Sequence, residues 1–341
     1  MRWRLSDEQQ DYQKSLRAWL ADIAGPRTLR GWYDAADSAP FEARFVTDGW
    51  SGVGLPEALG GQGGGLVELA LTAQELGRAA APSSAWLASV LAAPAAGGTG
   101  AALLLPAETV PHLADPLPGT GVVVPRVMCG ATTDRFVVPA RENDGVVLRV
   151  VDGGSVQRTA RHLLDRSRTA ADVRLDGTTG DTTDGDAPML LREASARGAV
   201  LVAADALGAS ERMLETAVAY AAQRRQFGVP IGSFQAVKHA AAQMLVGIEA
   251  ARSVVYFAAA SVDTPAGERD PQWLMHAAAA KSQVTAEAAR AADTALTLHG
   301  AIGYTWEHDL QLFYKRAKLD AALLGRPATW AGVIADGLHL V

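Results

Sequence analysis

The sequence predicts an α+β fold in three parts: an N-terminal helical domain, a small middle β domain and a C-terminal four-helix bundle. Helical patterns occupy both ends of the 341-residue chain, and short β-rich runs are confined to the middle. Because strands and helices are segregated rather than alternating, a parallel α/β sheet is not expected. The predicted domain ranges are 1–97, 98–189 and 190–341.

Apolar spacing predicts the helices of the first domain. Ser6 is the expected N-cap of the first helix, and Gln9 three residues later completes a capping-box pattern. The glycine-rich segment 54–65 predicts irregular structure. Helices are expected over residues 6–24, 66–81 and 84–93, the second of them ended by Pro82.

Short β-rich runs, bounded by Gly, Asp and Thr clusters, predict the middle domain. The segment 176–187 is rich in the same turn residues and is expected to be a loop or linker. Strands are expected over residues 103–105, 121–127, 135–138, 146–151 and 172–175.

Long helical patterns return from about Leu190. Helices of this length, joined by short turns, are typical of an antiparallel bundle. The expected helices cover residues 193–223, 233–262, 271–299 and 307–323, with a short last helix after Pro327.

Composition excludes several classes of function. The formal net charge is -6 and there is no basic stripe, so nucleic acid is not an expected partner. The single cysteine, Cys129, excludes an intrachain disulfide and a cysteine-based zinc site. No pair of histidines has metal-ligand spacing with a nearby carboxylate, so no metal is expected. A cytoplasmic location fits this use of cysteine.

The chain start and the apolar runs predict neither a secretory signal nor a membrane span. The first eight residues turn acidic at once and lack the apolar core of a signal peptide. The longest apolar runs, 199–204 and 277–280, are far shorter than a span requires and end at Asp205 and Lys281.

The segment 224–235 is the most informative for function. It reads Arg-Arg-Gln-Phe-Gly-Val-Pro-Ile-Gly-Ser-Phe-Gln and lies between two long helical patterns. An arginine can hold a phosphate through two parallel charge-assisted hydrogen bonds. Phe227 could cover an aromatic ring system, and Gln235 lies just inside the next helix. For the arginines alone, the alternative is a helix end where positive charge suits the dipole.

A second segment, 298–307, reads Leu-His-Gly-Ala-Ile-Gly-Tyr-Thr-Trp-Glu. Its glycines can end a helix through a left-handed turn, and they also allow a backbone to approach a ligand closely. By itself this segment could be a plain helix terminus. A functional interpretation is favoured because this segment lies in the same predicted bundle as the arginine segment.

Together the two segments resemble those of the acyl-CoA dehydrogenases. The strings Pro-Glu-Ala-Leu-Gly-Gly at 56–61 and Gln-Glu-Leu-Gly-Arg at 74–78 are similar to that family's first domain. The resemblance covers most of the chain and is strongest over 207–318. It implies a fold that agrees with the pattern above, and an FAD-dependent oxidoreductase of lipid metabolism. Such enzymes remove the α-proton and β-hydride of an acyl-CoA thioester.

The resemblance implies roles for particular residues. The arginine segment would reach the FAD of a neighbouring subunit, with Arg224 on the pyrophosphate and Arg225 at the surface or an interface. The glycine turn would meet the dinucleotide end. Electrons would pass to an electron-transferring flavoprotein. The residues implied at the cofactor are Arg224, Gln226, Phe227, Gln235, Thr297, Gly300 and Ala301.

The chain also departs from the family pattern. Thr297 stands where the family usually has a glutamine, and its shorter side chain would reach FAD only through water. Two family strings that contact flavin and substrate, Thr-Glu-Pro-Gly-x-Gly-Ser-Asp and Trp-Ile-Thr-Asn, are missing between residues 101 and 190. This domain is also short.

The catalytic base is the largest departure, because proton abstraction beside a thioester needs a base within reach. Leu324 stands where the family usually has its glutamate, and Gly198 stands near the position used by a minority. Glu193 and Asp205 lie within about two helical turns of Gly198 and are candidates for a displaced base. The alternative for each is a solvated surface charge. The catalytic residue therefore stays unknown.

Three hypotheses follow. In the first, the chain is a subunit without its own flavin-facing site, which completes the FAD site of a related catalytic subunit in a hetero-oligomer. In the second, it is a self-sufficient, homo-oligomeric acyl-CoA dehydrogenase with a displaced carboxylate. In the third, it is a non-enzymatic structural homologue. The first is preferred, because the Arg224 segment is intact while the base and the β-domain strings are missing.

Overall fold

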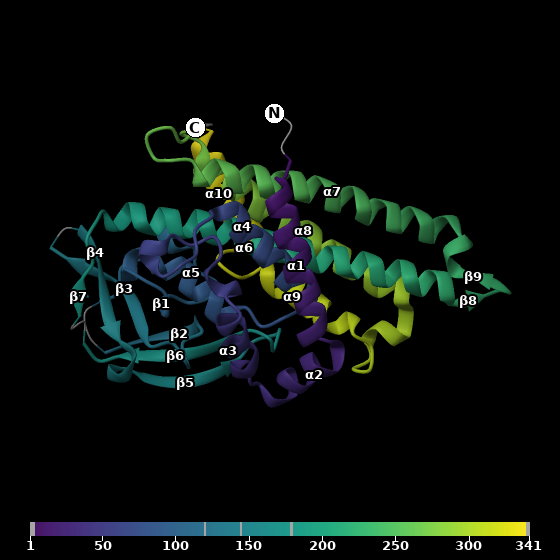
Figure 1. Cartoon of the computed structure of the whole chain (residues 1–341), viewed down its shortest axis with the longest axis horizontal. Coiled ribbons are helices and arrows are strands. Elements are labelled where there is room, and N and C mark those ends of the chain that lie inside the picture. Colours follow the sequence, from purple (N-terminus) through teal and green to yellow (C-terminus); the bar gives the residue numbers. More distant parts are fainter. Residues whose placement is uncertain (1–3, 119–120, 144, 178–179, 339–341) are drawn as a thin grey trace.

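The computed structural model describes residues 4–118, 121–143, 145–177 and 180–338 (Figure 1). Helices come first along the chain, small sheets follow, and long helices complete it. This order confirms the predicted α+β fold. The domain ranges 1–97, 98–189 and 190–341 stay a prediction. Residues 1–3, which belong to the segment expected not to be a secretory signal, lie outside the described residues.

The N-terminal part begins at the predicted capping box. The Ser6 hydroxyl accepts a hydrogen bond from the Gln9 N–H, and the Gln9 side-chain oxygen accepts one from the Ser6 N–H. Two helices, α2 and α3, were not predicted; each has a proline in its first turn, where the fixed φ suits a helix start. The helices are α1 (Asp7–Ile23), α2 (Pro26–Ala35), α3 (Ala39–Thr47), α4 (Leu66–Ala79) and α5 (Ser84–Ala96).

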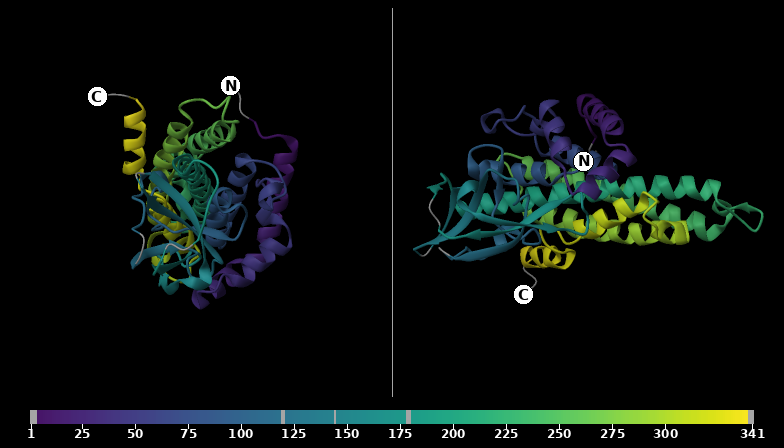
Figure 2. Two further views of the ribbon diagram at one scale, coloured as in Figure 1. Left: turned by 90° about the vertical axis from the view of Figure 1, so that its left-hand side faces the viewer. Right: turned by 90° about the horizontal axis from the view of Figure 1, so that it is seen from below.

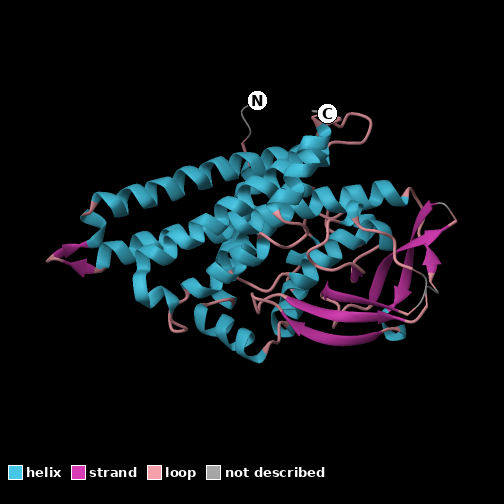
Figure 3. Cartoon of the chain, turned by 180° about the vertical axis from the view of Figure 1, so that it is seen from behind, coloured by secondary structure: helices cyan, strands magenta, loops and turns pink. Residues whose placement is uncertain are grey.

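The middle part consists of two small sheets, whose strands are drawn in magenta in Figure 3. One has the strand order β1-β3-β4-β7 and the other β2-β6-β5; only β1 and β3 pair in parallel among these strands. The strand expected over 103–105 lies two residues earlier. β5 and β7 were not predicted, and β7 lies within 176–187, which was expected to be a loop or linker. The strands are β1 (Ala101–Leu103), β2 (Val122–Met128), β3 (Arg135–Glu142), β4 (Gly145–Asp152), β5 (Gln157–His162), β6 (Thr169–Leu175) and β7 (Asp181–Thr182).

The C-terminal part is built on three long antiparallel helices (Figure 2). The first begins six residues before the expected residue 193, because Pro188 is tolerated in a first helical turn. A short hairpin of β8 (Arg225–Gln226) and β9 (Val229–Pro230) joins the first two helices. The helices are α6 (Ala187–Gln223), α7 (Gln235–Asp263), α8 (Trp273–His299), α9 (Leu310–Asp320) and α10 (Pro327–Gly337).

Two glycines let the N-terminal helices pack closely on the bundle. A Cβ atom built on Gly77 of α4 would lie 2.0 Å from the carbonyl oxygen of Asp205 on α6. A Cβ atom on Gly208 of α6 would lie 1.8 Å from the carbonyl oxygen of Gln74. The α4 and α6 backbones therefore touch at a crossing that only glycine permits.

By length and composition alone, α7 is long and apolar enough to cross a membrane. The short apolar runs in the sequence did not indicate this, because small residues such as alanine carry much of the apolar character of the helix. One side of α7 is buried against the bundle, through residues such as Met244, Ile248 and Val255. A bundle helix with one buried side can be equally long and apolar, so length and composition do not distinguish it from a membrane span.

Candidate functional site

The predicted cofactor segment is a hairpin that projects from one end of the bundle, opposite the middle sheets (Figures 1 and 3). Gln226 pairs with Val229, so the hairpin turn has only two residues, Phe227 and Gly228. Both have positive φ, 52° and 82°, which is the backbone of a type I′ turn. Asparagine or glycine normally occupies the first position, and a phenylalanine there is strained. Turn propensity therefore does not explain Phe227.

The side chain of Phe227 is 93% exposed at the tip of the hairpin. Its one ring contact in the described part of the chain is an edge contact with Phe234, at 6.2 Å between ring centres. The positive φ of Phe227 is an unfavourable backbone conformation, and its exposed ring gains little from packing. Strained backbone of this kind clusters at functional sites. The arrangement suits a ring that contacts another molecule.

The two neighbouring arginines differ in their contacts. Arg225 donates to the carbonyl oxygen of Gly228 at 3.3 Å and so helps to close the turn. The Arg224 backbone exchanges hydrogen bonds with Tyr220 and Ile231, but its guanidinium has no partner within the described residues. Arg224 is thus held at its backbone while its charged group stays available, which supports the distinction drawn from the sequence.

The second motif ends α8 at the same end of the bundle. His299, the last residue of α8, is buried and stacks on Tyr220 near the end of α6, with ring centres 4.7 Å apart. Gly300 then has φ 64° and ψ -144°, a region that is essentially restricted to glycine. No atom lies within 4 Å of a Cβ built on Gly300, so the space beside it is open. The structure therefore brings both motifs to one end.

All seven residues expected at the cofactor are exposed, in two groups. Arg224, Gln226, Phe227 and Gln235 belong to the hairpin and the start of α7. Thr297, Gly300 and Ala301 belong to the end of α8, where the Thr297 hydroxyl donates to the carbonyl oxygen of Asp293 in its own helix. No role was predicted for Tyr304 and Trp306, whose aromatic rings are also exposed beside the turn.

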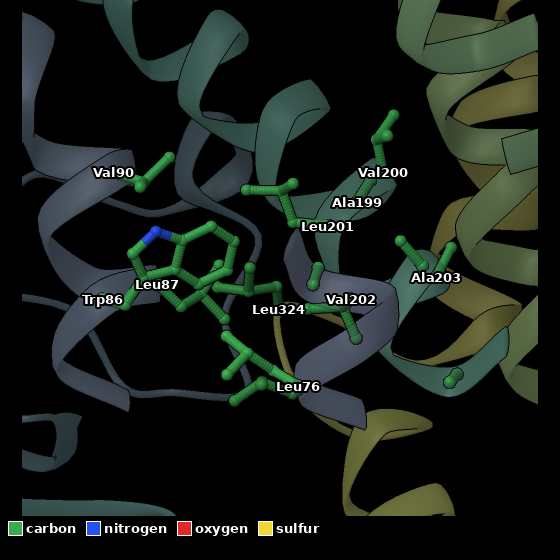
Figure 4. Packing of buried hydrophobic residues seen from close by; sticks show 14 of the residues in the cluster. Leu76, Trp86, Leu87, Val90, Ala199, Val200, Leu201, Val202, Ala203 and Leu324 are labelled. Carbon is green, nitrogen blue, oxygen red and sulfur yellow. The ribbon is translucent and has the colours of Figure 1, made fainter. Parts of the chain in front are cut away.

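The two positions at which the resemblance would place the base meet in space, in the first third of α6. A Cβ atom on Gly198 would lie 2.5 Å from Cδ1 of Leu324. Figure 4 shows Leu324 among apolar side chains of α4, α5 and α6, including Leu76 and Trp86. Neither position carries a carboxylate, and Leu324 occupies the space between them.

Little free volume remains around Leu324. The cavity between α5, the start of the middle part and Leu324 measures about 20 Å³, room for about one water molecule. The Leu324 N–H donates to the carbonyl oxygen of Ala107 at 2.7 Å, and its carbonyl oxygen accepts from the indole N–H of Trp330. The space around Leu324 is therefore packed as a core and is too small for an acyl chain.

The two candidates for a displaced base are already engaged. Asp205 is 3% exposed and receives two hydrogen bonds from the Arg316 guanidinium, both at 2.7 Å. Burial alone would raise the pKa of Asp205, but Arg316 and Arg168 beside it hold that pKa below its usual range. Glu193 pairs with Arg269 at 2.9 Å. Asp205 is therefore a structural anion, and neither carboxylate is free to accept a proton from substrate.

A larger cavity, about 510 Å³, lies between α1, α4, α6 and α9. Its arginines are already matched by carboxylates: Arg17 pairs with Glu75, and Arg78 pairs with Glu215. Its lining includes no residue of the hairpin and, of the segment 298–307, only Glu307. No group of three or more His, Cys, Asp or Glu in the described ranges could hold a metal ion.

Leu324→Ala should lower the free energy of unfolding by about 2–5 kcal/mol, because it opens a cavity in a packed core. Gly198→Ala should also destabilise, since the new methyl group meets Leu324. Combined, the two should cost less than their sum, because the vacated space accepts the methyl group. Urea unfolding of the two single variants and the double variant measures this coupling. Strict additivity would contradict the contact.

Two family models match the chain. Residues 6–101 match the acyl-CoA dehydrogenase N-terminal domain, and residues 190–339 match the acyl-CoA dehydrogenase C-terminal domain. The chain belongs to the acyl-CoA dehydrogenase family. The resemblance seen in the sequence is thereby confirmed, and with it the class of oxidoreductases to which the protein belongs. The family implies FAD as cofactor.

Full-length relatives support this membership. The acyl-CoA dehydrogenase IpdE2 of Mycolicibacterium smegmatis is 34% identical over 331 residues, which cover 95% of this chain and 96% of that protein. IpdE2 of Mycobacterium tuberculosis is 34% identical over 336 residues, with 94% of each chain covered. The shortened length is thus shared with other members of the family.

Solved structures of acyl-CoA dehydrogenases share the fold. The ChsE4-ChsE5 complex from Mycobacterium tuberculosis superposes with a TM-score of 0.87 at 24% identity over the whole of both chains. A glutaryl-coenzyme A dehydrogenase in complex with glutaryl-CoA gives 0.86 at 22% identity, covering 100% of this chain and 98% of that chain. At this identity the likeness concerns the fold alone.

Proposed function

We propose that this acyl-CoA dehydrogenase chain is one subunit of a hetero-oligomer, in which its hairpin completes the FAD site of a related catalytic subunit. The complex would carry out α,β-dehydrogenation of an acyl-CoA thioester. One observation supports the proposal: the segment expected to bind the cofactor is exposed, whereas Leu324 fills the space at the expected position of the base.

The hairpin fits the proposed role in its geometry. Its free guanidinium at Arg224 and its exposed ring at Phe227 point away from the chain's own core. A phosphate group needs such donors, and a planar ring system needs such a surface. The space around Leu324, by contrast, does not fit a flavin, because Leu324 and its neighbours fill it.

The outer side of α7 is a second feature that suits an oligomer. Val246 is 71% exposed, and Leu245 and Phe257 are about half exposed, on a helix whose opposite side is buried in the bundle. Exposed apolar side chains gathered along one helix mark an interaction surface. Because α7 begins directly after the hairpin, a subunit that covers α7 would also lie beside Phe227.

Relatives fit a paired arrangement as well. FadE34 of Mycobacterium tuberculosis is 31% identical over 344 residues, which cover 96% of this chain and only 47% of that protein. FadE34 thus carries about as much sequence again beside the part that resembles this chain. The ChsE4-ChsE5 structure is itself a complex. We propose a related acyl-CoA dehydrogenase subunit as the partner here.

The division of chemical work follows from these features. FAD, when bound, would supply a hydride-accepting group, and the proposed final electron acceptor is an electron-transferring flavoprotein. This chain would contribute Arg224 as a cation for the pyrophosphate and Phe227 as an apolar cover. The carboxylate that takes the α-proton would come from the partner, because Asp205 and Glu193 are both engaged in ion pairs.

The visible absorption spectrum tests the proposal. The purified chain alone should be colourless, and coexpression with a related catalytic subunit should give a yellow complex with a flavin band. A flavin band in the lone chain would contradict the shared site and favour a self-sufficient enzyme. A complex that forms but never contains FAD would favour a structural homologue. Which acyl-CoA is oxidised would follow from the substrate that bleaches the flavin band of the complex.

A further inference from the structure

The connection between α8 and α9 is a compact loop that carries the glycine turn. It covers residues 300–309, here called the glycine loop, and begins with a short 3₁₀ helix, Gly300–Tyr304. The rings of His299, just before the loop, and His308, near its end, meet edge to face with 4.7 Å between their centres. Loops of this length whose ends lie close together are frequently functional.

The base of the glycine loop is packed on the bundle. A Cβ atom built on Gly303 would lie 3.1 Å from side-chain atoms of both His299 and Leu296, so the backbone there lies directly against the end of α8. The Thr305 N–H donates to the carbonyl oxygen of Ile302 at 3.1 Å. The inner half of the loop is therefore held by α8 and by its own backbone.

The outer half of the glycine loop faces solvent and a cavity instead. The side chains of Tyr304 and Trp306 are 73% and 66% exposed. The cavity of about 510 Å³ lies between this half and the N-terminal helices, with residues 307–309 on one side and residues of α1 and α2 on another. A loop in this position needs a polar contact across the cavity to stay in one arrangement.

Arg30 of α2 makes that contact, and Figure 1 shows α2 beside the loop. Its guanidinium donates to the Asp309 carboxylate at 2.7 and 3.1 Å and to the carbonyl oxygen of Glu307 at 2.8 Å. It also donates to the carbonyl oxygen of Trp306. The rigid fork of a guanidinium can serve several acceptors at once, so one side chain of the N-terminal part fixes the outer half of the loop.

We propose that Arg30 is a positioning residue for the cofactor: it holds the glycine loop in the arrangement in which Gly300 and Ala301 meet FAD. This inference rests on the proposed function. Arg30 would act through the loop and would not touch the cofactor itself. When a binding arrangement is populated only part of the time, the apparent affinity falls by that fraction. The N-terminal part would in this way contribute to FAD binding at the far side of the loop.

Hydrogen exchange in the lone chain tests the contact without any cofactor. Arg30→Met should accelerate exchange at the Thr305 N–H at least about tenfold, because the outer half of the loop is released. Exchange at the Arg224 N–H, which is bonded to Tyr220 beside the hairpin, should not change. Unchanged exchange at Thr305 would overturn the proposal, since the loop would then be held without Arg30.

The FAD affinity of the coexpressed complex tests the consequence. Arg30→Met should weaken FAD binding about tenfold in a fluorescence titration well below the Tm, as expected if about a tenth of the loops keep the binding arrangement. Arg44→Met is the matched control, because Arg44 also pairs with an aspartate of the N-terminal part, Asp48 at 2.6 Å, and should leave FAD affinity unchanged. A lower Tm with unchanged FAD affinity would show that Arg30 is structural only.

A double-variant cycle on FAD affinity tests the route. Asp309→Asn should weaken binding less than Arg30→Met, because Arg30 keeps its carbonyl acceptors at Trp306 and Glu307. The two substitutions combined should be no weaker than Arg30→Met alone, because both act through one contact. Strictly additive losses would contradict this route.

The possible failures are distinguishable. If the wild-type complex binds no FAD, the proposed function and this inference fail together. If the wild-type complex binds FAD and Arg224→Ala weakens that binding while Arg30→Met does not, only the role of Arg30 is refuted.

Discussion

Replacing Arg316 with methionine should lower the free energy of unfolding by about 3–5 kcal/mol, because it leaves Asp205 buried without its main counter-charge. Arg316 is fully buried and also donates to the carbonyl oxygen of Ala81 and to the hydroxyl groups of Ser83 and Ser167. Its loss therefore weakens contacts to the N-terminal and middle parts together. Urea unfolding at neutral pH measures the change.

Arg290→Met is the matched control for this substitution. Arg290 also pairs with a carboxylate, that of Glu287, but its side chain is 66% exposed on α8. An exposed pair contributes only about 0–1 kcal/mol. Asp205→Asn combined with Arg316→Met should cost less than the sum of the single variants, because residue 205 can then no longer be an anion without its main counter-charge. Equal effects of Arg316→Met and Arg290→Met would contradict a buried, structural role for Arg316.

Arg224→Ala should weaken FAD binding by the coexpressed complex about 10- to 100-fold, the loss expected for hydrogen bonds to a charged group worth about 1.5–3 kcal/mol. The chain itself should remain as stable as the wild type, because the Arg224 side chain is exposed and has no partner within the described residues. Flavin content after gel filtration and a fluorescence titration with FAD measure the change.

Arg225→Ala controls for the loss of positive charge in the hairpin. Arg225 adjoins Arg224 and is also exposed, but its guanidinium is turned to the carbonyl oxygen of Gly228. Its replacement should change FAD affinity by less than about threefold, the scale of a few tenths of a kcal/mol. If both variants lose FAD equally, general electrostatics explains the binding and Arg224 has no special contact.

The helices were predictable where capping residues and apolar spacing indicate the same helix ends. The capping box at Ser6 and the long alanine-rich patterns set the ends of α1, α7 and α8 to within two residues. β5 escaped prediction, because its sequence Gln-Arg-Thr-Ala-Arg-His is almost wholly exposed and has no apolar alternation. α2 and α3 are only 10 and 9 residues long, too short for spacing alone to identify them.

The candidate site was partly predictable. Local sequence is enough to place Arg224 and Gly300 at helix ends, but not to show that only Arg224 has a free guanidinium. The meeting of Gly198 and Leu324 depends on tertiary packing between residues 126 positions apart. Asp205 was considered as a base because a helix position does not reveal its partner, and Arg316 lies 111 residues away. Long-range charge pairs of this kind have no local signal.

The single helix α6 has an evolutionary consequence. Gly198 at the closed end and Arg224 just beyond the other end are separated by roughly 40 Å along a continuous helix, at 1.5 Å per residue. Substitutions at one end leave the geometry of the other intact. After duplication of an ancestral gene, one copy could therefore lose its acid–base chemistry while selection retained the hairpin. A catalytic subunit would in this way become a non-catalytic subunit that functions only together with its paralogue.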